Sequence, residues 1–374
     1  MPSIAVGIAS PTGPNPKLFA PAIRFGRLVG LDSFLVFDHL QDFAPRSVWR
    51  SDRFTWQSAR QRSPHAQTDA TAVLASLAHS AGRVRLGTSV TEPLRHHPVA
   101  IAQSALTLAT LTRRPPILGI GAGERMNTAP YGIPFDQPVS RLEEALQILR
   151  LCLDSPGSLD FSGRFCHLNP APVDLAVPGR TPQIWVAAQG PRMLQIAGRY
   201  ADGWLPAYAP SPERYQAAHA DLTAAARDAG RDPSAITPSL QAGAVVAATR
   251  AEAEKAVNSR FLRFNAVATW SAQTWQAVGL EHPFGPSFRG FVDFIPETVD
   301  RSALETAMDE VPGELLRSGV LWGTADDVVD AVRGLGDAGL RHISLIPLSY
   351  PISRKLAAYF WWALARIIRG LRNY

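Results

Sequence analysis

Short apolar segments alternate with amphipathic segments along most of the chain, a pattern typical of strand–helix–strand units with a parallel sheet. The segments predicted as strands are 4–8, 34–37, 84–89, 117–121, 184–188, 203–205, 241–248 and 342–347. Helices are expected over about 16–29, 70–80, 98–111, 140–153, 192–200, 212–229, 250–257 and 324–339. Eight strands fit a closed (β/α)8 barrel or an open doubly wound sheet. The lack of GxGxxG after the first strand weakens the dinucleotide-binding alternative.

Three stretches of the chain lack this periodicity. Residues 40–66 form a long loop that contains Pro and Arg, and 161–180 is rich in Pro, which predicts a surface connection. Residues 258–320 are irregular, with Pro, Gly and aromatic side chains, and we interpret them as an insertion and a candidate lid. The predicted organisation is one barrel over 1–350, including this insertion, followed by a C-terminal helix over 351–374.

The C-terminal segment predicts a basic amphipathic helix. At about 100° per residue, its apolar face consists of Leu356, Phe360, Leu364, Ile367, Ile368 and Leu371. Its opposite face carries Lys355, Arg366 and Arg369, and the rings suited to a lipid headgroup boundary are Tyr359, Trp361 and Trp362. This pattern favours peripheral contact of 354–372 with the inner face of the plasma membrane. The alternative is a terminal helix packed on the barrel or in a dimer interface.

Charge and composition narrow the classes of function. The chain has 374 residues and a formal net charge of +5, and the segment from Arg354 on holds five basic residues and no acid. The rest of the chain is therefore near neutral, which disfavours nucleic-acid binding. Neither a membrane span nor a signal peptide is predicted, since there is no apolar run of about 18 residues and no basic N-terminal region. Two cysteines, Cys152 and Cys166, predict no disulfide framework and no metal site, and they suit a cytoplasmic protein.

Chemically active side chains follow the second and fourth strands. Asp38 and His39 come directly after strand 34–37, and active sites of parallel barrels lie at such C-terminal strand ends. His39 is a candidate proton donor or acceptor, although a loop histidine beside a capping aspartate gives the same pattern. After strand 117–121, Gly-Ala-Gly-Glu-Arg-Met-Asn lets the backbone approach a ligand. It also places Glu124 and Asn127 three residues apart, on one face of any helical turn there.

Two further strand ends are candidate ligand-binding loops. Ser89 and Val90 follow the third strand within Gly-Thr-Ser-Val-Thr-Glu-Pro, where small side chains admit a flat ring or mark only a turn. The fifth strand ends in Ala188, Gln189, Gly190, Pro191 and Arg192. Gly-Pro at a helix start leaves backbone N–H groups free for an anion, and Arg192 adds a cation suited to phosphate. A tight turn without a ligand is the alternative.

Together these four segments resemble the F420-dependent branch of the luciferase-like superfamily. The order along the chain is that of the family: a strand ending in Asp-His, then Gly-Thr-Ser-Val, then Gly-x-Gly-Glu-x-x-Asn, then Val-Ala-Ala-x-Gly-Pro. The resemblance covers 2–347. It implies a luciferase-like (β/α)8 TIM barrel that forms a homodimer and holds coenzyme F420, a deazaflavin, at its C-terminal mouth.

The resemblance also implies roles for individual residues. The residues matched to contacts with the coenzyme are Asp38, Ser89, Val90 and Asn127 near the ring and Ala188, Gln189, Gly190 and Arg192 along the phosphate-bearing tail. Ser89-Val90 corresponds to an unusual cis peptide that supports the ring. The catalytic residues would be His39, which protonates the alkoxide formed from a ketone, and Glu124, which orients or replenishes His39.

Two local features bear on the substrate. The Trp that closely follows Asp-His in the sugar-phosphate dehydrogenase of this family is replaced here by Phe43, which disfavours glucose 6-phosphate. The loop 121–127, followed by Pro-Tyr-Gly, is similar to that of the mycobacterial phthiodiolone ketoreductases, which reduce a ketone on a long wax lipid. We therefore predict an F420-dependent ketoreductase of cell-wall lipid biosynthesis. The alternatives are an FMN-dependent luciferase-like monooxygenase and a non-catalytic F420-binding barrel.

Overall fold

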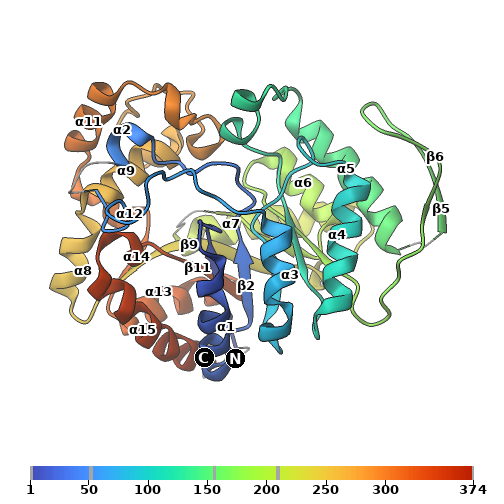
Figure 1. Cartoon of the computed structure of the whole chain (residues 1–374), viewed down its shortest axis with the longest axis horizontal. Helices are drawn as coiled ribbons and strands as arrows, with labels where there is room; N and C mark the ends of the chain where they lie inside the picture. Colours follow the sequence, from blue (N-terminus) through green and yellow to red (C-terminus); the bar gives the residue numbers. More distant parts are fainter. Residues whose placement is uncertain (1–2, 50–53, 155–156, 208–210, 373–374) are drawn as a thin grey trace.

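A closed ring of parallel strands forms the centre of the molecule (Figure 1). The computed structural model describes residues 3–49, 54–154, 157–207 and 211–372. The ring strands within these residues are β1 (Ala5–Ser10), β2 (Ser33–Val36), β3 (Arg85–Thr88), β4 (Ile117–Ile120), β7 (Gln183–Val186), β8 (Gly203–Trp204), β9 (Thr237–Val246) and β11 (His342–Pro347). They pair in chain order, and β11 pairs back onto β1. The predicted eight-stranded barrel is confirmed, and the open sheet is excluded.

Helices cover the outside of the barrel, as predicted. They are α1 (Phe19–Val29), α3 (Ala70–Ala81), α4 (Pro98–Leu111), α5 (Pro138–Asp154), α6 (Pro191–Tyr200), α7 (Pro212–Asp228), α8 (Arg250–Val257), α13 (Ala325–Asp337) and α15 (Arg354–Arg372). Local sequence sets their starts. Thr324 caps α13: its side chain accepts the Asp327 N–H at 3.3 Å, and the Asp327 carboxylate accepts the Thr324 N–H at 2.8 Å.

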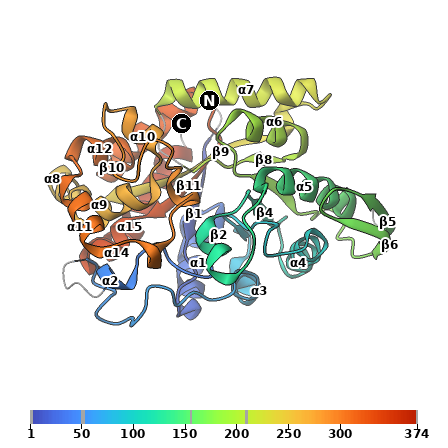
Figure 2. The same cartoon turned by 90° about the horizontal axis from the view of Figure 1, so that it is seen from above.

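The Pro-rich stretch 161–180 is not only a connection. Strands β5 (Gly157–Ser162) and β6 (His167–Val173) pair antiparallel and form an arm that projects from the barrel (Figure 1). Glu144 of α5 anchors the tip of this arm, because its carboxylate accepts the backbone N–H groups of residues 164–166 at 2.6 to 2.8 Å. Seen from above, the arm and the helices of the insertion lie on opposite sides of the barrel (Figure 2).

The segment 258–320 contains four α-helices, which corrects the prediction of an irregular insertion in part, because residues 277–300 are irregular apart from two short 3-10 helices. It contains α9 (Arg260–Thr269), α10 (Ala272–Gln276), α11 (Arg301–Glu310) and α12 (Gly313–Ser318), and it is followed by the short strand β10 (Leu321–Gly323) on β9. Their apolar residues form a second core with the β2–α3 loop, which includes α2 (Arg46–Trp49); Phe264 and Leu304 belong to it together with Trp49 and Phe54. These helices have ten residues or fewer, and such short elements carry little periodic signal.

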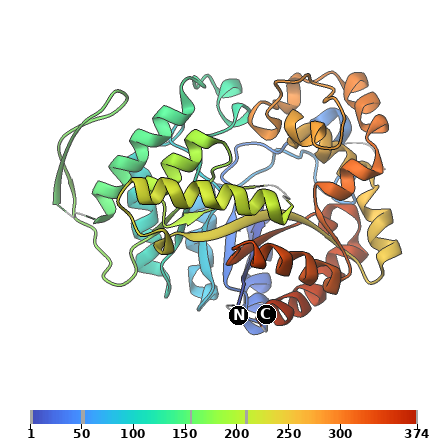
Figure 3. The same cartoon turned by 180° about the vertical axis from the view of Figure 1, so that it is seen from behind.

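The apolar face of the C-terminal helix α15 is buried in the barrel core. Phe360, Leu364, Ile367 and Leu371 are each 1% exposed or less, and α15 packs on α13, α1 and β1. The interpretation of this face as a membrane-binding surface is therefore wrong, because the barrel already covers it. The alternative of a helix packed on the barrel is confirmed. The termini lie side by side (Figure 3), and the Ile4 N–H donates to the carbonyl of Leu371 at 3.2 Å. No helix among the described residues is long and apolar enough to cross a membrane.

Candidate active site

A histidine and a carboxylate from two different loops meet at the C-terminal mouth of the barrel. His39 follows β2 and Glu124 follows β4, and His39 Nε2 lies 3.3 Å from Glu124 Oε2. Their side chains are only 13% and 18% exposed. The two residues predicted to be catalytic, 85 positions apart in the chain, are therefore brought together in a mostly dry environment.

The pair favours the charged form of the imidazole. Burial lowers the pKa of His39, but the negative charge of Glu124 and its hydrogen bond raise it, helped by the charges of Asp38 and Asp42. The raising contributions prevail, and the pKa of His39 lies above its usual value. The site therefore keeps a proton on His39 at a pH where a solvated histidine would begin to lose it.

Asn127 fastens the two catalytic loops to each other. Its side-chain Oδ1 accepts the Leu40 N–H at 2.8 Å, and its Nδ2 donates to Glu124 Oε2 at 3.1 Å. The residue is 3% exposed and lies at the end of the short 3-10 helix η2 (Arg125–Asn127). Nearby, the Gln41 amide donates to the Met126 carbonyl. In this structure the amide of Asn127 positions His39 and Glu124; its contact with a coenzyme stays a prediction.

The insertion reaches the same loops through ion pairs. Arg125, next to Glu124, lies 3.3 Å from Asp293 of the insertion. On the other flank, Glu297 pairs with His65 of the β2–α3 loop at 2.7 Å. The segment around 293–297 therefore connects the loop that carries His39 with the loop that carries Glu124. Whether it acts as a lid stays a prediction.

Asp38 lies at the centre of a second polar cluster. Its Oδ2 accepts from Thr91 Oγ1 at 2.6 Å and lies 3.2 Å from Arg95 and 3.3 Å from His96 Nε2. Burial raises the pKa of this carboxyl, but His96, Arg95 and Thr91 together hold it well below its usual range. The side chain stays ionised, and in turn it raises the pKa of His96. The predicted contact of Asp38 with the coenzyme is untested.

Sequence reasoning missed Arg95 and His96. The signal was present as the run Arg-His-His at 95–97, directly after a candidate ligand loop. A run of cationic residues in a neighbouring strand-end loop would have suggested partners for the carboxylate of Asp38. Arg95 also pairs with Glu92 at 2.5 Å and donates to the Asp38 carbonyl at 2.6 Å, so it holds the β2 and β3 loops together.

The third strand end contains the unusual peptide that the resemblance implied. The Ser89–Val90 bond is cis, and the Ser89 hydroxyl donates to Gln241 Oε1 of β9, across the barrel. Val90 packs on two glycines at the end of β4: a Cβ added to Gly121, just after the strand, would lie 3.0 Å from Val90 Cγ2, and one added to Gly119 would lie 2.1 Å from the Thr88 carbonyl oxygen. Sequence reasoning also missed Gln241. Its signal was a single amide side chain within an apolar strand, which indicates a polar residue that faces the inside of the barrel.

The fifth strand end forms the entry to α6. Ala188 is buried and its carbonyl accepts the Trp204 indole N–H at 2.7 Å, while the Gln189 amide donates to the Ala207 carbonyl at 3.0 Å. Gly190 is the N-cap of α6, and a Cβ added there would meet nothing within 4 Å. Arg192 is exposed and bonds to Ser140 at 2.8 Å. The contacts described for these residues do not reach the His39–Glu124 pair.

Among the residues that the structure describes, no group of three or more His, Cys, Asp or Glu side chains is arranged to hold a metal ion. The cysteines Cys152 and Cys166 are free, and burial raises the pKa of both thiols.

The sequence of this chain is similar to those of mycobacterial lipid enzymes. It is 38% identical over 351 residues, 92% of both chains, to the protein of Mycobacterium tuberculosis (strain ATCC 25618 / H37Rv) named phthiodiolone/phenolphthiodiolone dimycocerosates ketoreductase. It is 34% identical over 223 residues, 58% of this chain and 59% of the relative, to the F420-dependent hydroxymycolic acid dehydrogenase of the same strain.

Solved structures show the same fold at lower identity. The coenzyme F420-dependent tetrahydromethanopterin reductase of Methanopyrus kandleri superposes with a TM-score of 0.75 at 19% identity, over 99% of this chain and 98% of that one. An F420-dependent secondary alcohol dehydrogenase in complex with an F420–acetone adduct gives 0.73 at 20% identity, over 100% of both. The family model for luciferase-like monooxygenases matches residues 28–342. The resemblance inferred from four strand ends is thus confirmed: this oxidoreductase belongs to the luciferase-like monooxygenase family.

Proposed function

We propose that this enzyme uses coenzyme F420 to reduce the ketone of a phthiodiolone-type lipid to an alcohol. The observation that carries the proposal is the His39–Glu124 pair, with 3.3 Å between its nitrogen and oxygen, at the barrel mouth. The similarity to a named lipid ketoreductase over 92% of both chains supports the substrate class. The F420-dependent relative and the F420-dependent structures of the same fold support the coenzyme.

The residues at the mouth fit a flat ring with an anionic tail. Gly119 and Gly121 leave bare backbone against Thr88 and Val90, where added side chains would collide with these neighbours. At the other end, the space beside Gly190 is open, and the first turn of α6 offers backbone N–H groups and its positive dipole end. When bound, a reduced deazaflavin supplies a hydride for transfer to an electrophilic carbon.

The residues of this chain supply the proton. When the carbonyl carbon accepts a hydride, its oxygen becomes an alkoxide and needs one proton. We assign that proton to His39, since Nε2 faces Glu124 and the raised pKa keeps the ring protonated. After the transfer the imidazole is neutral. Glu124, held by Asn127 at 3.1 Å, keeps the ring in place and favours its reprotonation from solvent.

Two aromatic rings lie beside the proposed proton donor. The Phe37 and Phe43 rings lie 5.4 and 5.6 Å from the His39 ring, between centroids. Leu40 and Tyr131, from the same two loops as His39 and Glu124, are 42% and 48% exposed. Apolar surface around a polar centre suits a ketone carried on an alkyl chain, because the chain gains from leaving water while the carbonyl meets a proton donor.

The experiment is an anaerobic assay with reduced F420 and a phthiodiolone-type ketone, followed by the visible absorbance of the oxidised coenzyme and by mass spectrometry of the lipid alcohol. Wild type is expected to form both products in equal amounts. His39→Ala should lower turnover by more than about tenfold while F420 binding survives. His167→Ala, an exposed histidine on the β5–β6 arm, is the matched control and should behave as wild type. Undiminished turnover in His39→Ala would refute the assignment.

The same preparation separates the alternatives. An FMN-dependent monooxygenase would consume oxygen with reduced FMN and show no F420 oxidation. A non-catalytic barrel would bind F420 without turnover of any ketone or alcohol. Either result would overturn the proposed function.

A further inference from the structure

The neighbouring helices α1 and α15 share an outer surface that is both apolar and basic. We call it the α1–α15 face and define it by Arg24, Phe25, Leu28, Trp361, Trp362 and Arg369. The Phe25 and Trp361 rings meet edge to face, with centroids 6.0 Å apart, and join the two helices. At the lower end, Arg372 donates to the Gly30 carbonyl at 2.5 Å, so the two helices form one continuous surface.

Large apolar side chains are concentrated on this face. Leu28 is 82% exposed, Trp362 is 54% exposed and Phe25 is 36% exposed. With Leu18, just before α1, these are four of the eight large hydrophobic side chains that are exposed among the described residues. Scattered single residues of this kind are ordinary, but a cluster on two adjoining helices marks an interaction surface.

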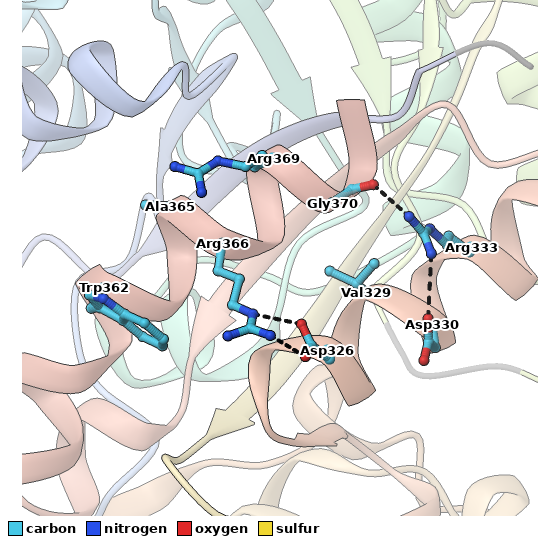
Figure 4. Close-up of a pocket in the computed structure, with 9 residues that line it drawn as sticks. All are labelled: Asp326, Val329, Asp330, Arg333, Trp362, Ala365, Arg366, Arg369 and Gly370. Atoms are coloured by element: carbon cyan, nitrogen blue, oxygen red, sulfur yellow. Dashed lines mark hydrogen bonds and ion pairs between the residues drawn. The ribbon is translucent and has the colours of Figure 1, made fainter. Parts of the chain in front are cut away.

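The charge of this face has one sign. Neither α1 nor α15 contains Asp or Glu, whereas α1 carries Arg24 and Arg27. Two acids of other helices do reach α15: Asp326 of α13 pairs with Arg366 at 2.7 Å beside a groove of about 740 Å³ (Figure 4), and Glu252 of α8 pairs with Lys355. Arg369 and Trp362 line the edge of the same groove, and in that view the Arg369 side chain extends away from the Arg366–Asp326 pair. The positive charge that remains faces outward over α1 and α15.

We propose that the α1–α15 face docks on a membrane surface that carries anionic lipids. Leu28 and Trp362 would lie at the headgroup boundary, with Arg24 and Arg369 beside lipid phosphates. This is the face of α15 opposite to the buried apolar stripe, so the barrel core stays intact on binding. A second copy fits less well, because neither α1 nor α15 carries an acid to meet the cations of the other copy in a two-fold contact. The proposal does not depend on the substrate.

The test is co-sedimentation of the full chain with vesicles of phosphatidylglycerol and phosphatidylcholine in equal parts, and with phosphatidylcholine alone. Wild type should bind the anionic vesicles and not the neutral ones. The double variant Arg24→Gln/Arg369→Gln should lower the partition coefficient by about 25-fold, at about fivefold for each cation. Leu28→Ser should weaken binding at unchanged charge.

The matched control is Arg214→Gln/Arg227→Gln. It changes net charge equally on α7, where Glu213, Asp221 and Asp228 lie among the cations, and should bind as wild type does. Equal losses in the two double variants would overturn the proposal, since binding would then follow net charge alone. Absence of binding by wild type would also overturn it. If wild type does not bind the vesicles and the variants dissociate a dimer in analytical ultracentrifugation, the occupant is a second copy. Turnover of a water-soluble ketone should be unaffected in every variant, which separates this test from that of the proposed function.

Discussion

Replacing Glu124 with Gln tests whether the carboxylate holds the proton on His39. The two charges lie 3.3 Å apart and their side chains are 13% and 18% exposed. At an effective dielectric constant of about 20, that separation corresponds to an attraction of about 5 kcal/mol, an upper value because both charges also lose hydration. Gln keeps the shape of Glu and can still accept from Asn127, so the substitution removes charge with little change in packing.

The pH profile of kcat/KM for ketone reduction gives the first readout. Without the charge of Glu124, burial is the largest remaining influence and lowers the pKa of His39. The alkaline limb of the profile should therefore move to lower pH, while activity at the acidic end is largely retained. Above that limb the loss should approach the about 10²- to 10⁴-fold contribution of a general acid. Glu305→Gln removes a carboxylate from the insertion, where it pairs with Arg301, and should leave the profile unchanged.

Stability gives a second readout that needs no substrate. The folded-state pKa of His39 is raised, so the pair stabilises the fold fully below about pH 6.5 and loses this contribution as pH rises through the folded-state pKa. The difference in unfolding free energy between wild type and Glu124→Gln should be largest at acidic pH and shrink with rising pH. A difference that grows with pH, or an unmoved alkaline limb, would contradict the assigned role of Glu124.

Three further substitutions test the framework around the site. Burial and a nearby arginine lower the pKa of His342 to about 3, so neutral His342 stabilises the fold above about pH 6.5, and this stabilisation is lost as pH falls. In denaturant titrations, His342→Gln should therefore reduce the acid-induced loss of unfolding free energy by up to about 1.4 kcal/mol per pH unit. An unchanged slope of unfolding free energy against pH would refute this. Glu144→Ala leaves the N–H groups of residues 164–166 without their acceptor, so hydrogen exchange in the β5–β6 arm should accelerate by at least about tenfold, with turnover unchanged; a uniform change across the chain would count against it. Phe360→Ala should destabilise by about 3–5 kcal/mol and Trp362→Ala by less than about 1 kcal/mol, because the first is 1% and the second 54% exposed; equal effects in thermal unfolding would show that α15 is not packed as described.

Much of the fold followed from local patterns. The helix over 98–111 and the strand over 342–347 have the predicted bounds, and the capping box at Thr324 starts α13 where the sequence indicates. These elements are long or are bounded by clear start and stop residues, so the preferences of neighbouring residues along the chain suffice to define them. The segment 258–320 was misread because its helices are short and gain stability from a second core shared with the distant residues Trp49 and Phe54. Such long-range packing leaves little trace in a local window.

The residues of the candidate site were predictable from the sequence, but the contacts among them were not. His39 and Glu124 stood out because each follows an apolar strand, and parallel strands of a barrel present their ends at one mouth. The partners of Asp38, namely Arg95 and His96, come from another loop, and only the folded chain shows the distances of 3.2 and 3.3 Å that hold its carboxylate ionised. The use of Asn127 as a link between Leu40 and Glu124 likewise depends on two loops meeting.

The C-terminal helix shows the division most clearly. The sequence by itself determined that 355–372 is helical and two-faced, because helix periodicity depends only on neighbours along the chain. It did not determine what covers the apolar face, since an apolar surface can be buried against either lipid or protein. The tertiary structure decided that question: the barrel packs on Phe360, Leu364 and Ile367, and the basic residues with Trp362 are left facing outward. Burial is a property of the whole fold, whereas periodicity is a property of the local sequence.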